Sequence, residues 1–372
     1  MSLTYLDYNA TTPVWPQVVD AVSNTLTHIG NPSSVHSLGA KARKLVDESR
    51  EKVAAFINCE PKQVVFTSGG TEANNLALNQ SNKDKVLVSS IEHESILDAC
   101  NNAEKIAVAM HRVVDLDNLE SILRIRPEIE LVCVMLANNE TGVLQPIEKI
   151  SLITKKLGIR LHTDAIQAAG KIDINWQTLG VSSMSISGHK IGGPQGVGAL
   201  ILEDTDTFRP LAVGGGQERK RRAGTENLPG IVGFGVAASI MASKKKLMNK
   251  VATIRDDLES RVLSSTSNTQ IYGREAARLP NTSCVSMPGV PADEQVAAMD
   301  LKGFMISAGS ACSSGKVEPS HVLMAMGASK LEAADAIRVS LGWNTTVSDI
   351  KEFFAAWLAL YDKNRRRASA AG

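Results

Sequence analysis

The sequence lacks any uninterrupted apolar run of roughly 18 residues, the length that a membrane-spanning helix needs. Its first residues, MSLTYLDYNATTP, contain neither the positively charged region nor the apolar stretch of a signal peptide. An excess of one charge is also missing, because 40 Lys and Arg residues face 39 Asp and Glu residues, for a formal net charge of +1. We therefore expect a soluble, cytoplasmic protein that binds neither a membrane nor nucleic acid directly.

Cysteine is scarce, and the few cysteines are far apart. No CxxC pair occurs, which argues against a zinc site or a dithiol redox motif, and we predict no bound metal. This usage fits a reducing compartment. Each cysteine is then either a small buried hydrophobe or a reactive thiol. The five residues are Cys59, Cys100, Cys133, Cys284 and Cys312.

The length of 372 residues exceeds what one hydrophobic core usually serves, roughly 250 to 300 residues, so we expect two domains. Short runs rich in Val, Ile and Leu alternate with helical patterns. This alternation predicts an α/β fold with a mainly parallel sheet that is covered on both faces. The runs lie at residues 64–68, 86–90, 131–137, 159–164, 184–188 and 197–202.

A change of pattern marks the second domain. Residues 230–265 form one long helical pattern of the kind that often bridges two domains, and shorter strand and helix patterns follow it. We expect a large domain over residues 13–250 and a smaller α+β domain over residues 251–372, joined by an N-terminal segment over residues 1–12. The final RRRASAAG resembles a frayed tail.

Polar residues follow several of the apolar runs, and the carboxyl ends of parallel strands gather at one edge of a sheet. Gly70 and Thr71 lie in a glycine turn that opens a helical pattern, where backbone N–H groups can hold a phosphate. A plain turn is the alternative interpretation. His93 and Asn139 follow the next two runs, and a structural role for His93 is equally open.

An acid and a lysine end two later runs. Asp164 closes HTD, with Gln167 three residues on, and Lys190 stands in SGHKIGGPQGVG. Together with a phosphate site, they are what pyridoxal phosphate requires: the carboxylate pairs with the pyridine N–H and the amine forms a Schiff base. The ring of His93 can cover one cofactor face, and desolvation would lower the pKa of Lys190. A surface lysine is the alternative.

Two further residues are candidates for substrate chemistry. Cys312 lies in SACSSG, among small and hydroxyl residues that bury little, which favours an exposed and reactive thiol over a structural one. Arg338 lies in IRVSLGW, at the start of a strand-like piece. Its guanidinium suits a substrate carboxylate, and a structural salt bridge is equally open.

These residues lie in motifs that resemble, nearly end to end and in order, those of the cysteine desulfurases of the iron-sulfur-cluster and nitrogen-fixation type, within the class V aminotransferases. The motifs are YLDYNATTP, GNPSSVHSLG, FTSGGTEANNLAL, EHESI, ANNETGVLQPI, HTDAIQAAGKI, SGHKIGGPQGVGAL, GGGQERKRRAGTEN, SACSSG and IRVSLGW. The resemblance implies the fold type I of pyridoxal-phosphate-dependent transferases, the aspartate aminotransferase-like fold, in a homodimer.

The resemblance also implies a role for each site residue. Lys190 matches the lysine that holds the cofactor, Asp164 the partner of its pyridine nitrogen, and His93 the ring stacked on it. Gln167 matches a contact to the phenolic oxygen, and Thr225 one that reaches the phosphate from the other subunit. The full implied cofactor set is Gly70, Thr71, His93, Asn139, Asp164, Gln167, Ser187, His189, Lys190 and Thr225, of which Gly70, Thr71, Ser187 and His189 match phosphate positions.

The implied reaction converts L-cysteine to L-alanine. Lys190 moves the proton at the α-carbon, and Cys312 attacks the substrate sulfur as a thiolate and keeps it as a persulfide, with His93 as the nearest base. Asn139 and Arg338 bind the substrate. The sulfur then passes to an acceptor protein such as an iron-sulfur scaffold. The chain ends soon after WLALYDK without the extension by which housekeeping members dock that scaffold, so the acceptor stays open.

Two alternatives remain at this point. A selenocysteine lyase, or another transferase of the same fold, would not need Cys312. A nonenzymatic sulfur-carrying or regulatory protein would need neither Lys190 nor Asp164, because binding alone requires no electron sink.

Overall fold

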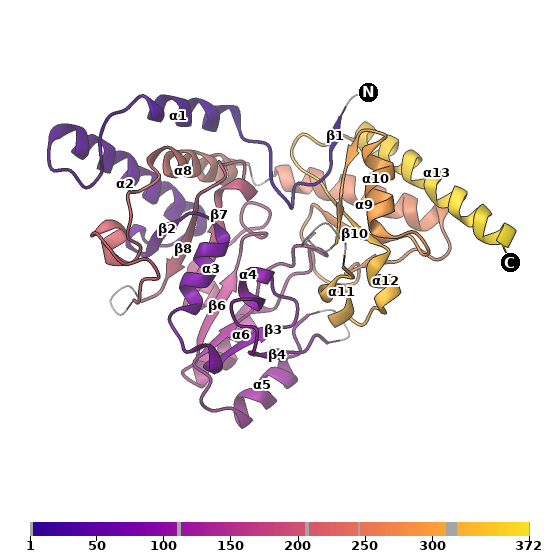
Figure 1. Cartoon of the computed structure of the whole chain (residues 1–372), viewed down its shortest axis with the longest axis horizontal. Coiled ribbons are helices and arrows are strands. Elements are labelled where there is room, and N and C mark those ends of the chain that lie inside the picture. Colours follow the sequence, from indigo (N-terminus) through magenta and orange to yellow (C-terminus); the bar gives the residue numbers. More distant parts are fainter. Residues whose placement is uncertain (1–2, 110–112, 205–207, 245, 310–317, 372) are drawn as a thin grey trace.

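The computed structural model describes residues 3–109, 113–204, 208–244, 246–309 and 318–371, with side chains to residue 367. Figure 1 shows two units, each built around its own sheet, with the N-terminal segment running from one to the other. Within the described ranges, every helix is too short or too polar to span a bilayer.

The larger sheet has seven strands in the order β2-β8-β7-β6-β5-β3-β4. β8 runs antiparallel to β2 and β7, and all other neighbours are parallel. The prediction of a mainly parallel α/β sheet is therefore confirmed. The strands are β2 (Val64–Thr67), β3 (Val86–Ser89), β4 (Glu104–Ile106), β5 (Leu131–Cys133), β6 (Arg160–Asp164), β7 (Ser183–Ser187) and β8 (Gly198–Leu202).

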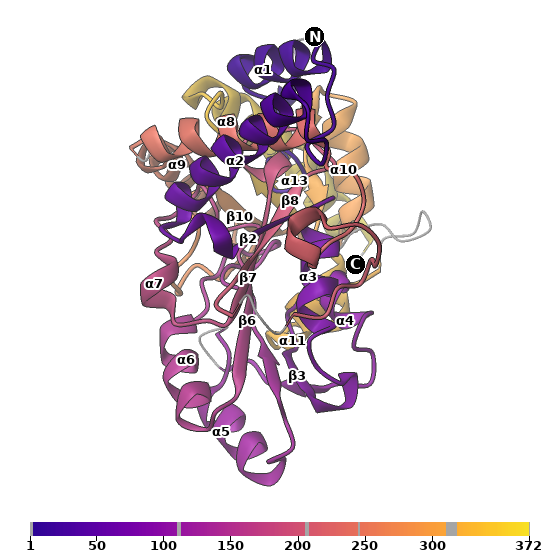
Figure 2. The ribbon, with the colours of Figure 1, turned by 90° about the vertical axis from the view of Figure 1, so that its left-hand side faces the viewer.

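Helices cover both faces of this sheet, as its apolar strands require. In Figure 2, α3 and α4 lie on one side of the strands and α6 and α7 on the other. The helices of this unit are α1 (Pro16–Leu26), α2 (Ser37–Ile57), α3 (Gly70–Leu78), α4 (Glu94–Leu97), α5 (Leu116–Ile125), α6 (Ile147–Lys156), α7 (Trp176–Leu179) and α8 (Leu228–Ser243), with 3-10 turns η1 (Pro61–Gln63), η2 (Lys83–Lys85), η3 (Gly188–Lys190) and η4 (Gln217–Lys220).

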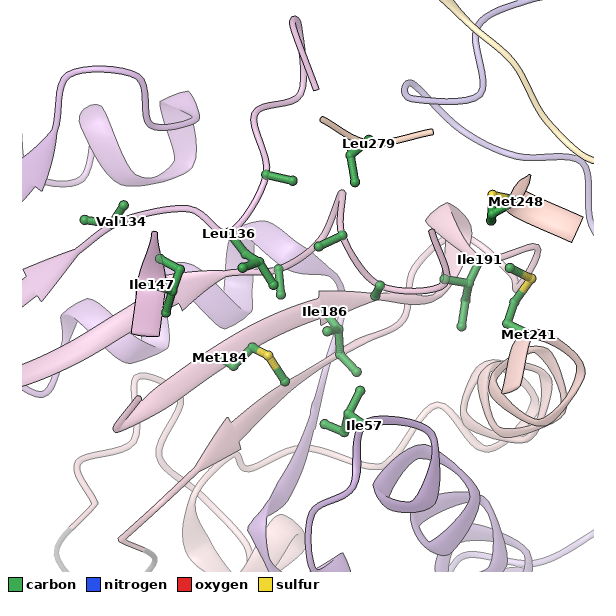
Figure 3. Packing of buried hydrophobic residues seen from close by; sticks show 14 of the residues in the cluster. Ile57, Val134, Leu136, Ile147, Met184, Ile186, Ile191, Met241, Met248 and Leu279 are labelled. Carbon is green, nitrogen blue, oxygen red and sulfur yellow. The ribbon is translucent and has the colours of Figure 1, made fainter. Parts of the chain in front are cut away.

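The main core lies between the sheet and α2 and α8. Ile57 of α2, Met184 and Ile186 of β7 and Met241 of α8 belong to one buried cluster, part of which Figure 3 shows. Gly235 lets α8 approach α2 closely, because a Cβ there would lie 2.9 Å from the Cβ of Ser49. This packing holds η3, at the end of β7, in a fixed position against α8.

The smaller unit has an antiparallel sheet in the order β12-β13-β10-β9, and β1 pairs in parallel with β11 beside it. Its strands are β1 (Thr4–Tyr5), β9 (Ile271–Tyr272), β10 (Thr282–Ser286), β11 (Phe304–Met305), β12 (Ser307–Ala308) and β13 (Ala336–Ser340). Its helices are α9 (Leu247–Ser265), α10 (Ala292–Asp300), α11 (His321–Ala325), α12 (Lys330–Ala334) and α13 (Val347–Ala371).

Two expectations about helices are wrong. The pattern over residues 230–265 is two helices, because α8 packs against α1 and α2 while α9 packs against α13, and three lysines separate them. The end of the chain continues α13 to Ala371 instead of fraying from Arg365 on. The division into domains at residue 250 falls inside α9 and stays a prediction.

Candidate active site

A cavity of about 340 Å³ lies at the carboxyl ends of β5, β6 and β7, where the larger unit meets the smaller one and the N-terminal segment. All predicted site residues that the structure describes line it except Thr225. Those that line it are Gly70, Thr71, His93, Asn139, Asp164, Gln167, Ser187, His189, Lys190 and Arg338. The topology therefore brings together residues that the sequence separates by more than 200 positions.

Asp164 ends β6 and is buried in the wall of the cavity. Its Oδ2 accepts a hydrogen bond from Asn74 Nδ2 at 2.7 Å, and its Oδ1 accepts one from the N–H of Ile166 at 2.9 Å. Burial raises the pKa of this carboxyl, while these hydrogen bonds and the charges of His93 and Lys190 act in the opposite direction. A cationic partner in the cavity would hold Asp164 as a carboxylate.

A series of hydrogen bonds between buried side chains orients Asp164 on the side away from the cavity. His162, two residues earlier on the same face of β6, lies 3.1 Å from Asn74 Oδ1 through Nε2 and 2.8 Å from Ser183 Oγ through Nδ1. Burial lowers the pKa of His162 to about 3, so the ring is neutral. Because the amide oxygen only accepts, Nε2 carries the hydrogen, and the NH₂ group of Asn74 must face Asp164. Sequence reasoning missed both residues, although period two places His162 on the face of Asp164.

Lys190 ends η3, directly after β7. Its Nζ donates hydrogen bonds to the carbonyl oxygens of Asn9 and Ala10, the second at 2.7 Å. Burial lowers the pKa of Lys190 to about 8, and the positive charge of Arg338 adds to this effect, whereas Asp7 and Asp164 oppose it. At pH 7 roughly a tenth of this amine is therefore unprotonated and nucleophilic, far more than for a lysine with the ordinary pKa of about 10.4.

His93 caps the N-terminus of α4. Its Nδ1 accepts a hydrogen bond from the N–H of Ser95 at 3.0 Å, which leaves Nε2 as the nitrogen that carries hydrogen in the neutral ring. Nε2 lies 3.6 Å from Glu94 Oε2. The capping contact fixes the imidazole at the cavity wall, and its stacking role stays a prediction.

One end of the cavity offers unpaired hydrogen-bond donors. α3 begins at Gly70 without a side-chain cap, so its first N–H groups have no partner within the helix. Ser187 Oγ, also in the cavity wall, is buried and has no partner among the described residues. These donors and the positive end of the helix dipole suit a phosphate group.

Arg338 lies in β13 and reaches the cavity from the smaller unit. Its Nη2 donates to Asp7 Oδ1 at 2.7 Å, and its Nη1 donates to the carbonyl oxygen of Asn139 at 3.1 Å. The salt bridge that the sequence left open is therefore present. Nε is buried without a partner among the described residues. Nη1 and Nη2 each carry a second N–H, so the guanidinium retains donors for a ligand.

Comparison with known proteins places this site in a family. The model described as "Aminotransferase class-V" matches residues 4–353. The chain belongs to the class-V aminotransferase family. The family generally uses pyridoxal phosphate.

Individual relatives within the family narrow the resemblance. A protein named cysteine desulfurase from Trichormus azollae is 41% identical over 364 residues, which cover 94% of this chain and 90% of the relative. One named cysteine desulfurase IscS from Dictyoglomus turgidum is 39% identical, with 93% and 91% covered. A solved NifS-like structure from Rickettsia africae has a TM-score of 0.91 at 37% identity, covering 97% of this chain and 99% of that one.

A further solved structure, titled "SspA in complex with cysteine", has a TM-score of 0.78 at 32% identity and covers 91% of this chain and 98% of that one. These likenesses confirm the resemblance to cysteine desulfurases and the fold type I that it implied. The comparisons do not test the roles of single residues, which stay predictions.

One described residue of the predicted set, Thr225, is absent from the wall of the cavity. Thr225 lines a separate hollow of about 90 Å³ with Ser68 and Arg222, and its contact to a phosphate in another subunit stays a prediction. Cys312 lies outside the described residues.

Several cavity residues of this family member were not singled out from the sequence. Glu140 Oε2 accepts a hydrogen bond from Ser320 Oγ at 2.5 Å, and burial raises the pKa of Glu140 to about 8. His321 Nε2 lies 3.0 Å from the carbonyl oxygen of Glu92. Asn9 contacts Gln167 and Lys171 of the larger unit and Asn281 of the smaller one. Asn9 and Glu140 lie inside the motifs YLDYNATTP and ANNETGVLQPI. Their positions in these motifs could have identified them as candidates for the site.

Proposed function

We propose that the chain is a pyridoxal-phosphate-dependent cysteine desulfurase that converts L-cysteine to L-alanine and holds the sulfur as a persulfide on Cys312. One observation carries the proposal: Lys190, with a pKa lowered to about 8, and the buried carboxyl of Asp164 line the same cavity. An amine and an acid in this arrangement are what the cofactor's chemistry uses.

The residues present fit the cofactor. Lys190 would hold it covalently, Asp164 would pair with its pyridine N–H, and the free donors of α3 and Ser187 Oγ would hold its phosphate. When bound, pyridoxal phosphate supplies an electron sink for negative charge at the α-carbon of an amino acid. The neutral side chains of His162 and Asn74 hold the carboxylate oxygens of Asp164 in place. Because a carboxylate stabilises a nearby positive charge, this arrangement favours a protonated pyridine nitrogen.

The chain's own residues would then carry out the remaining steps. The guanidinium of Arg338 and the side chain of Asn139 would bind the substrate carboxylate, and Lys190 would move the proton at the α-carbon. The Cys312 thiolate attacks the substrate sulfur, so that an S–S bond forms as the C–S bond breaks, and the remaining three-carbon unit takes up a proton as alanine. His93 lines the cavity and is our candidate base for this thiol. Its Nδ1 is the basic nitrogen of the neutral ring, so it would give up the hydrogen bond from the Ser95 N–H as it takes the thiol proton.

We also propose a homodimer in which Thr225 completes the phosphate site of the partner subunit. Thr225 lies away from the cavity of its own chain, which supports this assignment. The persulfide sulfur would pass to an acceptor protein of iron-sulfur cluster assembly or of another thiolation pathway.

The proposal is tested by product analysis. Purified protein reconstituted with pyridoxal phosphate is expected to form alanine and sulfide in equal amounts from L-cysteine when a thiol reductant is present. Alanine from selenocysteine, with none from cysteine, would favour the selenocysteine lyase alternative. Absence of visible absorbance after reconstitution would contradict any pyridoxal-phosphate function.

Cofactor attachment should also report the lowered pKa of Lys190. Only the unprotonated amine is nucleophilic, and burial lowers its pKa to about 8. We expect the rate at which apoprotein gains visible absorbance to rise about tenfold per pH unit below that value and to level off above it. Stopped-flow absorbance between about pH 6 and pH 10 measures this, and a rise that continues toward the ordinary lysine value of about 10.4 would contradict it.

A further inference from the structure

Lys171 is a buried lysine that the catalytic proposal does not use. Only 7% of its surface is exposed, and within the described ranges no carboxylate forms an ion pair with its amine. Instead, Nζ donates to Gln167 Oε1 at 2.6 Å and to Asn9 Oδ1 at 2.7 Å. Placing a lysine in the interior costs solvation free energy. Its presence at this position therefore calls for a functional explanation.

The lysine determines how two amide side chains are turned. An amine of lysine donates hydrogen bonds to neighbouring amides, so the oxygen of Gln167 must face Lys171. The NH₂ group of Gln167 then faces the other way, where Nε2 donates to the carbonyl oxygen of Asn9 at 2.9 Å. Gln167 lines the cavity, so this orientation decides whether a ligand meets a donor or an acceptor there.

Asn9 is held by the same amine. Its Oδ1 accepts from Lys171 and from Asn281 Nδ2 at 3.0 Å, so its own NH₂ group faces the carbonyl oxygen of Asn139 at 3.1 Å and Thr282 Oγ1 at 2.9 Å. The backbone carbonyl of Asn9, in turn, accepts from both Gln167 Nε2 and Lys190 Nζ. Lys171 is therefore linked to Lys190 through one residue that also joins the larger unit to the smaller one.

We propose that Lys171 is a positioning residue of the active site, which turns the Gln167 NH₂ group toward the cofactor's phenolic oxygen and holds the Asn9 carbonyl at Lys190. The inference rests on the proposed function and adds a residue to it. Burial lowers the pKa of Lys171 well below its ordinary value, and the charges of Lys190 and Arg338 add to this effect while Asp7 opposes it. Two donors suffice for both contacts, so an uncharged amine serves as well as a charged one.

The test is a double-mutant cycle read from the bound cofactor. Lys171→Met keeps the length of the side chain and removes its donors, and Gln167→Leu removes the amide. A donor to the phenolic oxygen favours the deprotonated form of the bound cofactor, so each single variant should raise the pH midpoint of its visible absorbance by about one unit. The double variant should shift no further than Gln167→Leu alone, because Lys171 acts through Gln167.

The midpoints of the Lys171 variants decide whether Lys171 has a positioning role. A wild-type midpoint in Lys171→Met, or shifts that add in the double variant, would overturn the inference even if thermal stability falls. If Lys171→Met does not fold, Lys171→Gln keeps an NH₂ donor group on a shorter side chain, and its midpoint should lie between the wild-type and Gln167→Leu values. An unshifted Lys171→Gln together with a shifted Gln167→Leu would overturn the inference, because Gln167 would then be oriented without Lys171.

The control is Lys149→Met on the exposed side of α6, which should leave the midpoint unchanged. The readout needs no cysteine turnover, so it separates this inference from the proposed function. If Lys171→Met binds the cofactor and its midpoint is unshifted, only the positioning role of Lys171 is contradicted. If the wild-type protein does not convert cysteine and the midpoint of Lys171→Met is shifted as described, only the desulfurase reaction is contradicted.

Discussion

Lys190→Ala is expected to abolish covalent attachment of pyridoxal phosphate and to lower alanine formation from cysteine by at least about 10³-fold. The substitution removes the cavity's amine with a pKa of about 8, which would both hold the cofactor and move the proton at the α-carbon. Mass spectrometry after borohydride reduction measures attachment, because the reduced link adds the cofactor's mass to the peptide that contains residue 190. Alanine analysis measures turnover.

The matched control is Lys149→Ala, which changes an exposed lysine on α6. It should retain wild-type attachment and turnover. Borohydride labelling at another lysine in the wild-type protein, or turnover in Lys190→Ala close to that of the control, would show that Lys190 is not the residue that holds the cofactor. Labelling of Lys171 in the wild-type protein would be the most telling alternative result. Lys171 is also buried with a lowered pKa, but it does not line the cavity.

The sequence predicts the larger sheet well because its strands are continuous apolar runs. β2, β3, β6, β7 and β8 lie within or beside the expected ranges, since only a strand covered on both faces tolerates such composition. β4 was not predicted, because the edge strand EKI carries the exposed residues Glu104 and Lys105 and bears no apolar signal. The break between α8 and α9 was missed because helical periodicity does not say which layer each turn packs against.

The site was predictable to the extent that it depends on strand ends. Asp164 and Lys190 close neighbouring parallel strands, β6 and β7, so sheet topology alone brings them to one edge. The contacts of Asn9 could not be predicted in this way. Asn9 bonds to Lys171, Asn281 and Thr282 only because the N-terminal segment crosses between the two units, and no local pattern encodes that crossing.

The pairing of Arg338 with Asp7 shows the same limit. These residues are separated by 331 positions, and the sequence offered two interpretations of the arginine without a means to choose. The structure contains the salt bridge, and the binding of a substrate carboxylate stays a prediction. Residue-level roles of this kind depend on which face of a side chain is occupied, and this is decided by tertiary contacts.

The cysteines of the chain differ in how readily their thiols ionise, and a sulfur carrier needs a thiolate. Only a thiolate attacks sulfur, and burial raises the pKa of a thiol. Burial raises the pKa of Cys59 to about 12 with a further contribution from Glu60, and burial also raises the pKa of Cys100 and Cys133. Cys284 lies buried in β10. At neutral pH Cys59, Cys100 and Cys133 are therefore poor nucleophiles. The sequence predicts the opposite for Cys312, because small and hydroxyl residues flank it.

Cys312→Ala is accordingly expected to abolish alanine and sulfide formation from cysteine while leaving the visible absorbance of the bound cofactor intact. Cys59→Ala is the matched control, since Cys59 is the most exposed of the four described cysteines, and it should keep wild-type turnover. Brief treatment of the wild-type protein with iodoacetamide near neutral pH should label Cys312 before Cys59, as peptide mapping would show. Full turnover in Cys312→Ala, or inactivation that follows labelling of Cys59, would exclude Cys312 as the persulfide carrier without affecting the assignment of Lys190, because the two residues would act on different atoms of the substrate.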